Sequence, residues 1–431
     1  MSAERGDPMI PFLPRGVDLS PETGEFKTPD IEPFFAGGTL LVPLPGADGA
    51  GSWMVKPGDS VERGQPLAAP PQNIVVCAPR PGIVREFRRV DLPLHGETVC
   101  AVLECRKAPD PPVREIAREQ HDPEQLLMEA RAAGIIDERD GVPLYKKLRR
   151  LHRQGIQTLL ADASDSEPYV FSGEAILHQN AAEALAGLAL AAIACGAQEY
   201  AAAVRGVPRW KRLEPFRDPA RASLLMEAGS RYPACAVLKN RLTASGRPAG
   251  SVGVQACEAL YAAVYRRAPQ TSAVVTVTGD GVAEPKILRV TLGTPLRTVL
   301  EYCGAAENAD ILIGSPVCGA AADNWDIPVT ADTRCILARV NPPVPKVYEC
   351  VGCGRCAAAC PQGLLPWYFY REQRRSQTEL SLPGAEKCIG CRACEAACPS
   401  RIRLEAAVRR HAESAETPKP IEMERERGDA E

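Results

Sequence analysis

The sequence has little net charge, few aromatic residues and no apolar run long enough to cross a membrane. Its net charge of −3 over 431 residues gives no basic excess, so composition offers no argument for a nucleic-acid partner. The longest apolar stretch, residues 181–197, is rich in alanine and contains Glu183, which makes it too short and too weakly apolar to span a bilayer. No secretory signal is visible. We therefore expect a cytoplasmic chain that binds no nucleic acid and has no direct membrane insertion.

Cysteine, by contrast, is plentiful, and two runs of cysteines share one spacing. Each run reads C-x2-C-x2-C-x3-C and is followed by proline: Cys350, Cys353, Cys356, Cys360 and Pro361 in the first, and Cys388, Cys391, Cys394, Cys398 and Pro399 in the second. This is the bacterial spacing for paired [4Fe–4S] clusters, in which the fourth cysteine of each run binds the other cluster. We therefore predict two metal sites, the first formed by Cys350, Cys353, Cys356 and Cys398 and the second by Cys388, Cys391, Cys394 and Cys360.

Two other uses of these cysteines agree less well with the pattern. Disulfides are disfavoured in an intracellular chain. Zinc sites use C-x2-C pairs rather than a triplet followed by a fourth cysteine and proline, repeated twice.

Between the runs, Trp367, Tyr368 and Phe369 are expected to shield a cluster, because solvent exclusion tunes cluster potential. The remaining cysteines lack ligand spacing and are expected to be small buried side chains.

The pattern along the chain predicts an α/β multidomain protein, and the length suggests about three domains. We divide it into an extended arm (1–38), an all-β module (39–107), a Rossmann-like α/β domain (108–270), a further β-rich domain (271–340), an α-helical ferredoxin domain with two [4Fe–4S] clusters (341–411) and a disordered tail (412–431).

The all-β module contains V-K-P-G-D-x-V-x-x-G-Q-x-L followed by A-P-x-x-G-x-V, which resembles the biotinyl/lipoyl-type barrel-sandwich hybrid. In that family a carrier lysine lies in a hairpin between the halves. No lysine occurs between Pro57 and Cys105, so we interpret the module as structural.

The α/β domain shows the order strand, loop, helix, strand. Residues 155–161 form an apolar strand, 164–169 a polar loop, 175–195 a long helix that ends at a glycine, and 200–204 a second strand. Such a βαβ unit binds ligands at the carboxyl ends of its strands. In the following domain, strands are expected at 273–279, 288–291, 311–314 and 335–338, with a helix at 296–302; this resembles the β-grasp-like SLBB domain.

The domain order and several motifs resemble the C subunit of Rnf electron-transport complexes. The motifs are SEPYVFSGEAIL at 166–177, VVTVTGDGV at 274–282, LGTPL at 292–296, GSPVCG at 314–319 and the two cysteine runs. The resemblance implies an α/β domain related to the NADH- and FMN-binding subunit of respiratory complex I, with electrons passing from NADH through FMN to the clusters. It also implies redox partner proteins, either membrane-bound Rnf subunits or a dedicated reductase, and a peripheral position on the inner face of the cell membrane.

The sequence departs from that family where FMN is expected. The family loop is G-x-x-G-x-G-G-x-x-F-P, and only Gly134, Gly141 and Pro143 match it. Three carboxylates, at 137, 138 and 140, stand where backbone amides would approach a phosphate. A carboxylate at 4 Å repels a phosphate by ~1 kcal/mol per charge pair even in water. Arg139 and the Lys146-Lys147 pair are expected to offset this in part.

The second cofactor segment is also altered. Asp162 replaces a family Asn and Asp165 a family Glu, whereas Glu167, Pro168 and Tyr169 are kept. The resemblance thus gives a candidate FMN/NADH site of Gly134, Gly141, Asp162, Asp165, Glu167 and Tyr169. The other interpretation of Glu167 and Tyr169 is capping and packing at a strand end.

Two functions remain open. One is an NADH-oxidising entry module with FMN, and the other is a flavin-free electron-transfer adaptor for a dedicated reductase, as in the RnfC-like protein of proline reductase. Cys318, where the family usually has Met, is either an accessible thiol that exchanges electrons as a thiolate or a small buried residue.

Overall fold

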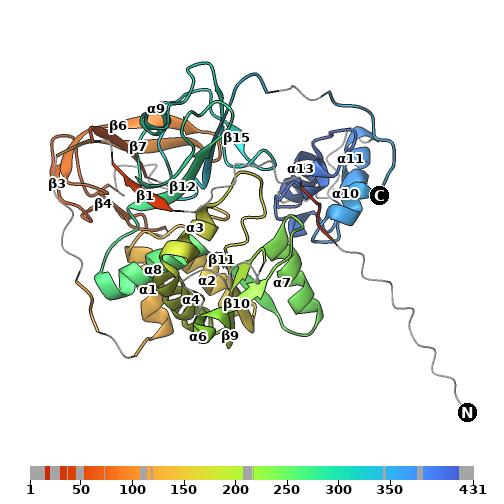
Figure 1. Ribbon diagram of the computed structural model, residues 1–431, viewed down its shortest axis with the longest axis horizontal. Coiled ribbons are helices and arrows are strands. Elements are labelled where there is room, and N and C mark those ends of the chain that lie inside the picture. Colours follow the sequence, from red (N-terminus) through yellow and green to blue (C-terminus); the bar gives the residue numbers. More distant parts are fainter. Residues whose placement is uncertain are drawn as a thin grey trace, which may run out of the picture. The chain divides into compact units, whose positions relative to one another are not determined.

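The computed structural model describes residues 15–19, 30–35, 37–44, 53–71, 73–106, 114–117, 120–206, 216, 218–342, 346–375 and 382–416. The chain forms two compact units. The larger comprises Asp18–Val344, and the smaller combines Met1–Val17 with Pro345–Glu431 (Figure 1). Most of the predicted arm and residues 417–431 of the predicted tail lie outside the described residues.

A four-stranded parallel sheet organises the middle of the larger unit. Its strands are β8 (Thr158–Asp162), β9 (Glu199–Val204), β10 (Leu225–Glu227) and β11 (Ala249–Gly253), in the order β10-β9-β8-β11. β8 is buried along its whole length, as its uninterrupted apolar sequence predicts. Asp162 pairs with Gly253, so the carboxyl ends of β8 and β11 meet at one edge.

Helices cover both faces of this sheet. They are α1 (Pro123–Ala132), α2 (Leu144–Arg153), α3 (Ser172–Gln179), α4 (Ala181–Cys195), α6 (Pro219–Ala222), α7 (Ala234–Ala244) and α8 (Val254–Arg266). Leu159 of β8 belongs to the core formed with α1, α2, α4 and α8, whereas the next residue, Leu160, belongs to the core formed with α7. Gly187 lets α4 cross α8 closely, because an added Cβ would overlap the Cys257 carbonyl.

The all-β module consists of two antiparallel sheets. The larger contains β2 (Thr39–Pro43), β3 (Ser60–Val61), β6 (Gly82–Leu92) and β7 (Gly96–Cys105), in the order β2-β7-β6-β3. The smaller pairs β4 (Pro66–Ala68) with β5 (Val76–Cys77). Leu40, Leu67 and Leu103 are among the buried residues of its core. The barrel-sandwich and Rossmann-like names remain interpretations of these sheets.

A six-stranded mixed sheet completes the larger unit. Its order is β1-β13-β12-β16-β14-β15, with β1 (Ile31–Phe34), β12 (Ser272–Thr278), β13 (Lys286–Thr291), β14 (Asp310–Ile313), β15 (Ala320–Ala321) and β16 (Cys335–Arg339), and α9 (Leu296–Tyr302) follows β13. The expectation of a surface arm is wrong for residues 31–34. This segment is an edge strand parallel to β13, because Ile31 and Phe34 bury their side chains in two different cores.

The smaller unit is helical. Its elements are α10 (Arg355–Ala359), α11 (Pro366–Arg375), the 3₁₀ turn η3 (Ala385–Lys387), α12 (Ala393–Ala396) and α13 (Leu404–Glu416). α13 continues five residues past the predicted boundary at 411, so the disordered tail does not begin at 412. Near the N-terminus, the Arg15 guanidinium donates to the Pro361 carbonyl at 2.9 Å.

Within the described residues, no single helix is both long and apolar enough to cross a membrane. Only α3 and α4 taken together would qualify, and they meet at a bend of 105°.

Candidate functional site

The smaller unit contains two cavities, each lined by four cysteines. The first is lined by Cys350, Cys353, Cys356 and Cys398, and the second by Cys360, Cys388, Cys391 and Cys394. These are the same two sets that the spacing predicts, with the fourth cysteine of each run crossing to the other cavity. Their role as cluster ligands remains a prediction.

The local sequence explains how three sulfurs of each run reach one cavity. Gly354, with φ of 73°, and Arg392, with φ of 52°, place a left-handed residue just before α10 and α12. The chain reverses there, and each short helix then carries its last cysteine away. Buried Ala359 and Ala393 keep the space beside the sulfurs free of large side chains.

Both cavities fit a cubane better than a single ion. Among the described residues, no three His, Cys, Asp or Glu side chains converge on a point where one ion would be held. The remaining walls are largely apolar, with Ile402 and Leu404 in the first cavity and Leu364 and Val408 in the second. Four sulfur ligands around a volume from which water is largely excluded are what a [4Fe–4S] cluster requires.

The walls of the two cavities differ in charge and in their aromatic neighbours. The second includes Arg392 and the buried Glu405, which lie 3.7 Å apart, and Glu405 is also paired with Arg409 at 2.7 Å. Among the described residues, no charged side chain lines the first. Of the expected aromatic shield, Trp367 lines the first cavity. Phe369 packs on His411 and belongs to the apolar cluster that includes Cys360 and Val408 of the second cavity.

In the larger unit, the loop expected to hold a flavin phosphate is occupied by its own carboxylates. Glu138 accepts hydrogen bonds from the backbone N–H groups of Gln255, at 2.8 Å, and Ala256, at 3.1 Å. These are the second and third residues of α8, whose preceding residue, Gly253, has no side chain with which to cap the helix. A helix N-terminus attracts anions because its first N–H groups are unpaired. Here the chain itself supplies the acceptor, the Glu138 carboxyl group.

The neighbouring carboxylates are also paired. Asp137 is fully buried and accepts from the Gly253 N–H at 2.9 Å and the Lys147 ammonium at 2.8 Å. Lys147 also binds Asp140 at 2.9 Å. Lys147 therefore balances the charges of Asp137 and Asp140 by direct ion pairs, as the offset by basic residues requires.

The residues at the end of β8 form a second buried network. Arg139 binds Asp162 at 3.0 Å and Glu167 at 3.5 Å, and Arg334 binds Glu167 at 2.6 Å. Asp165 accepts from the backbone N–H of Glu174 at 2.7 Å, near the start of α3. Burial tends to raise the pKa of Glu167, but the two arginines outweigh it and lower the pKa to about 2. Sequence reasoning missed Arg334, because nothing local marks a residue 167 positions from its partner.

The structure does not bring the six candidate cofactor residues together. Asp162, Asp165 and Glu167 are buried in contacts of their own, and Tyr169 has a left-handed φ of 66° with its carbonyl facing the Cys335 thiol. Gly134 and Gly141 instead line a separate cavity. With the α8 amides bound to Glu138, the described residues do not fit FMN at this edge of the sheet.

Cys318 belongs to this network as a neutral thiol. Its sulfur donates to Glu167 at 3.0 Å, and burial, together with that carboxylate, raises its pKa to about 11. A thiolate is the reactive form of cysteine. The side chain is half-buried, and its contacts disfavour electron exchange as a thiolate.

Comparison with known proteins places these features in a family context. A family model described as "4Fe-4S dicluster domain" matches residues 349–402, and one described as "SLBB domain" matches residues 274–319. The chain is 29% identical over 355 residues to the C subunit of the ion-translocating oxidoreductase complex of Erwinia tasmaniensis, covering 73% of this chain. It is 27% identical over 391 residues to the C subunit of the same kind of complex from Rhodobacter capsulatus, covering 84% of this chain. This chain is a homologue of these C subunits.

The resemblance to the Rnf C subunit is thus confirmed, as are the SLBB and dicluster domains within a mixed α/β chain. The chain spans 42% of the Erwinia protein and 75% of the Rhodobacter protein. An NAD+-reducing [NiFe]-hydrogenase in the H2-reduced state is 18% identical, with a TM-score of 0.43 over 51% of this chain and 47% of the hydrogenase chain. That likeness is too weak to carry an argument.

Proposed function

We propose that the chain carries electrons between redox partner proteins through two [4Fe–4S] clusters, without a flavin or NADH site of its own. A bound [4Fe–4S] cluster takes up and releases single electrons. The cysteines of each cavity would hold the irons, and the apolar walls would exclude water. The partners would be subunits of a membrane-bound complex or a dedicated reductase, and the chain would reach the inner face of the membrane through them.

The flavin-free form of this proposal rests on one observation. Glu138 occupies the N–H groups at the start of α8, which lie at the carboxyl edge of the parallel sheet, where such folds bind ligands. A phosphate would have to displace a carboxylate that is held by two backbone hydrogen bonds. The Arg139–Asp162–Glu167 contacts occupy the neighbouring end of β8.

An anaerobic visible spectrum of the reconstituted full chain tests the proposal. We expect about eight irons per chain, and a broad absorption that dithionite bleaches but NADH with added FMN leaves unchanged. Bleaching by NADH would restore the alternative, in which electrons enter through FMN. A chain that binds no iron would refute the cluster assignment itself.

Two variants separate the cluster assignment from the absence of a flavin site. Cys353→Ser should lower the iron content and leave the response to NADH unchanged. Glu138→Gly should retain the iron. Its affinity for FMN shows whether the α8 amides can bind the flavin phosphate once the carboxylate is removed. FMN binding by the unaltered chain, with an affinity that Glu138→Gly does not improve, would contradict the view that Glu138 blocks the site.

A further inference from the structure

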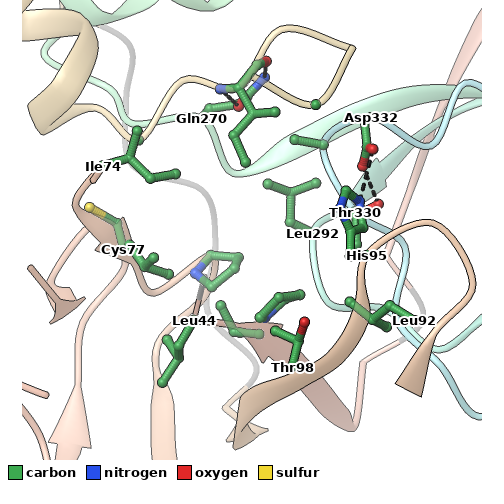
Figure 2. A pocket seen from close by; sticks show the side chains of 18 of the residues that line it. Leu44, Ile74, Cys77, Leu92, His95, Thr98, Gln270, Leu292, Thr330 and Asp332 are labelled. Carbon is green, nitrogen blue, oxygen red and sulfur yellow. Dashed lines mark hydrogen bonds and ion pairs between the residues drawn. The ribbon is translucent and has the colours of Figure 1, made fainter. Parts of the chain in front are cut away.

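A cavity of about 350 Å³ in the larger unit is not used by the proposed electron transfer. It lies among β2, β5, the β6–β7 turn, the segment after α1 and the segment 329–332, all within the larger unit (Figure 2). Its volume lies in the range of small-molecule binding sites. Gly134 and Gly141 contribute to its wall, so the loop that carries Glu138 has one face toward this cavity.

The cavity walls are mainly apolar. Figure 2 shows Leu44, Ile74, Leu92 and Leu292 around its space. Cys77 also lines it, and burial raises the pKa of this thiol to about 11, which leaves it uncharged. A ligand here would gain most of its affinity by removing apolar surface from water.

His95, Asp332 and Thr330 form one group of polar side chains in the wall, and Glu97 and Thr98 also line the cavity. His95 Nε2 lies 2.9 Å from Asp332 Oδ2, and the Thr330 hydroxyl donates to Asp332 Oδ1 at 2.6 Å. The hydrogen bond with Asp332 raises the pKa of His95, which favours the protonated ring. Both oxygens of Asp332 are thus engaged, whereas Nδ1 of His95 has no hydrogen-bond partner among the described residues.

The polar group on the other side of the cavity is already satisfied. The Gln270 amide accepts from the Ile136 N–H at 2.9 Å and donates to the Ile136 carbonyl at 3.3 Å. Gly141 keeps the approach to the ion pair open, since an added Cβ would lie 3.2 Å from Asp332 Oδ2 and 3.4 Å from His95 Cε1. The cavity therefore offers apolar side chains, the Thr98 hydroxyl and the His95 imidazole, whose charge is balanced by the Asp332 carboxylate.

We propose that this cavity binds an uncharged carbonyl compound of one or two fused rings. The rings would contact Leu44, Ile74 and Leu292, and the carbonyl oxygen would accept a hydrogen bond from His95. A ligand with a net charge would be disfavoured, because Asp332 already neutralises the imidazolium and Glu97, the other charged side chain of the wall, is paired with Arg89. This site is independent of the cluster cavities and of the proposed electron transfer.

A matched pair of probes tests the donor directly. We would titrate the full, reconstituted chain with 1-tetralone and with tetralin, which has the same two rings without the carbonyl, and follow binding by ligand-observed NMR. We expect saturable binding of 1-tetralone that is about tenfold tighter than that of tetralin, the difference made by one hydrogen bond to a charged donor. Equal affinities, or no saturable binding of either probe, would overturn the proposal.

Two variants locate the effect. His95→Phe keeps a ring of similar size but removes the donor, so the preference for 1-tetralone should disappear while tetralin still binds. His178→Phe makes the same change at a histidine outside the cavity, and the tenfold preference should persist. A preference that survives His95→Phe would show that the donor is not His95. If His95→Phe does not fold, the ratio of the two probe affinities measured on the unaltered chain still decides whether the cavity recognises the carbonyl group.

Discussion

Replacing Glu138 with Gln should make the larger unit more stable at alkaline pH without changing it much at acidic pH. Burial, reinforced by the Asp137 carboxylate, raises the pKa of Glu138 from 4.5 to about 7, although the N–H groups of Gln255 and Ala256 act in the opposite direction. Between pH 4.5 and about pH 7, Glu138 has lost its proton in the unfolded chain but retains it in the folded chain. Stability therefore falls as the pH rises through this window, and stays at the lower value above it.

The size of the effect follows from the two pKa values. A rise from 4.5 to about 7 corresponds to about 3 kcal/mol at 1.36 kcal/mol per pKa unit. Gln keeps an oxygen that can accept from the start of α8 but carries no charge. We therefore expect the variant to be close to the unaltered chain at pH 5 and more stable by about 2–3 kcal/mol at pH 8.5.

Hydrogen exchange of α8 peptides during urea denaturation would measure this difference for the larger unit alone. Glu124→Gln, on an exposed side chain of α1, is the matched control and should show no difference that depends on pH. A Glu138→Gln variant that is less stable than the unaltered chain at pH 8.5 would refute the reasoning. It would show that the α8 amides stabilise the charged carboxylate more than burial destabilises it.

Further predictions concern the clusters and the network at β8. Cys353→Ser should lower the iron content from about eight toward about four, with one cluster signal retained by electron paramagnetic resonance; a full complement would contradict the ligand assignment. Glu405→Gln should raise the potential of the second cluster by an amount on the order of tens of millivolts and leave the first unchanged in a redox titration, because it removes a negative charge from one cavity wall only. Glu167→Gln should cost about 3–5 kcal/mol of stability in urea denaturation, because Arg334 loses its carboxylate partner and Arg139 keeps only Asp162. The exposed pair of Arg85 and Glu104 is its control: Glu104→Gln should change stability by less than about 1 kcal/mol, and equal effects of the two variants would contradict the role of burial.

The cysteine runs were readable from sequence because cluster ligation imposes a fixed local spacing. Three cysteines must face one cavity, so the pattern C-x2-C-x2-C carries most of the geometry, and proline after the fourth cysteine marks the end of the short helix. The core elements were readable for a similar reason. β8 shows a continuous apolar run, and α4 is a long alanine- and leucine-rich segment that ends at Gly196.

Only the tertiary structure shows that the expected flavin site is occupied by the chain's own carboxylates. The sequence shows that carboxylates replace glycines in the loop, but it does not show that Glu138 reaches α8, 117 residues away, or that Arg334 reaches Glu167. Such pairings depend on which strand ends meet at one edge of the sheet. The same holds for β1, whose four residues are too short to show a period, and for the cavity beside His95, whose walls come from separate segments of the larger unit. Local spacing thus determined the metal chemistry of this chain, because ligand geometry is a short-range constraint. Packing determined which charges are buried and paired, because burial is a property of the assembled fold.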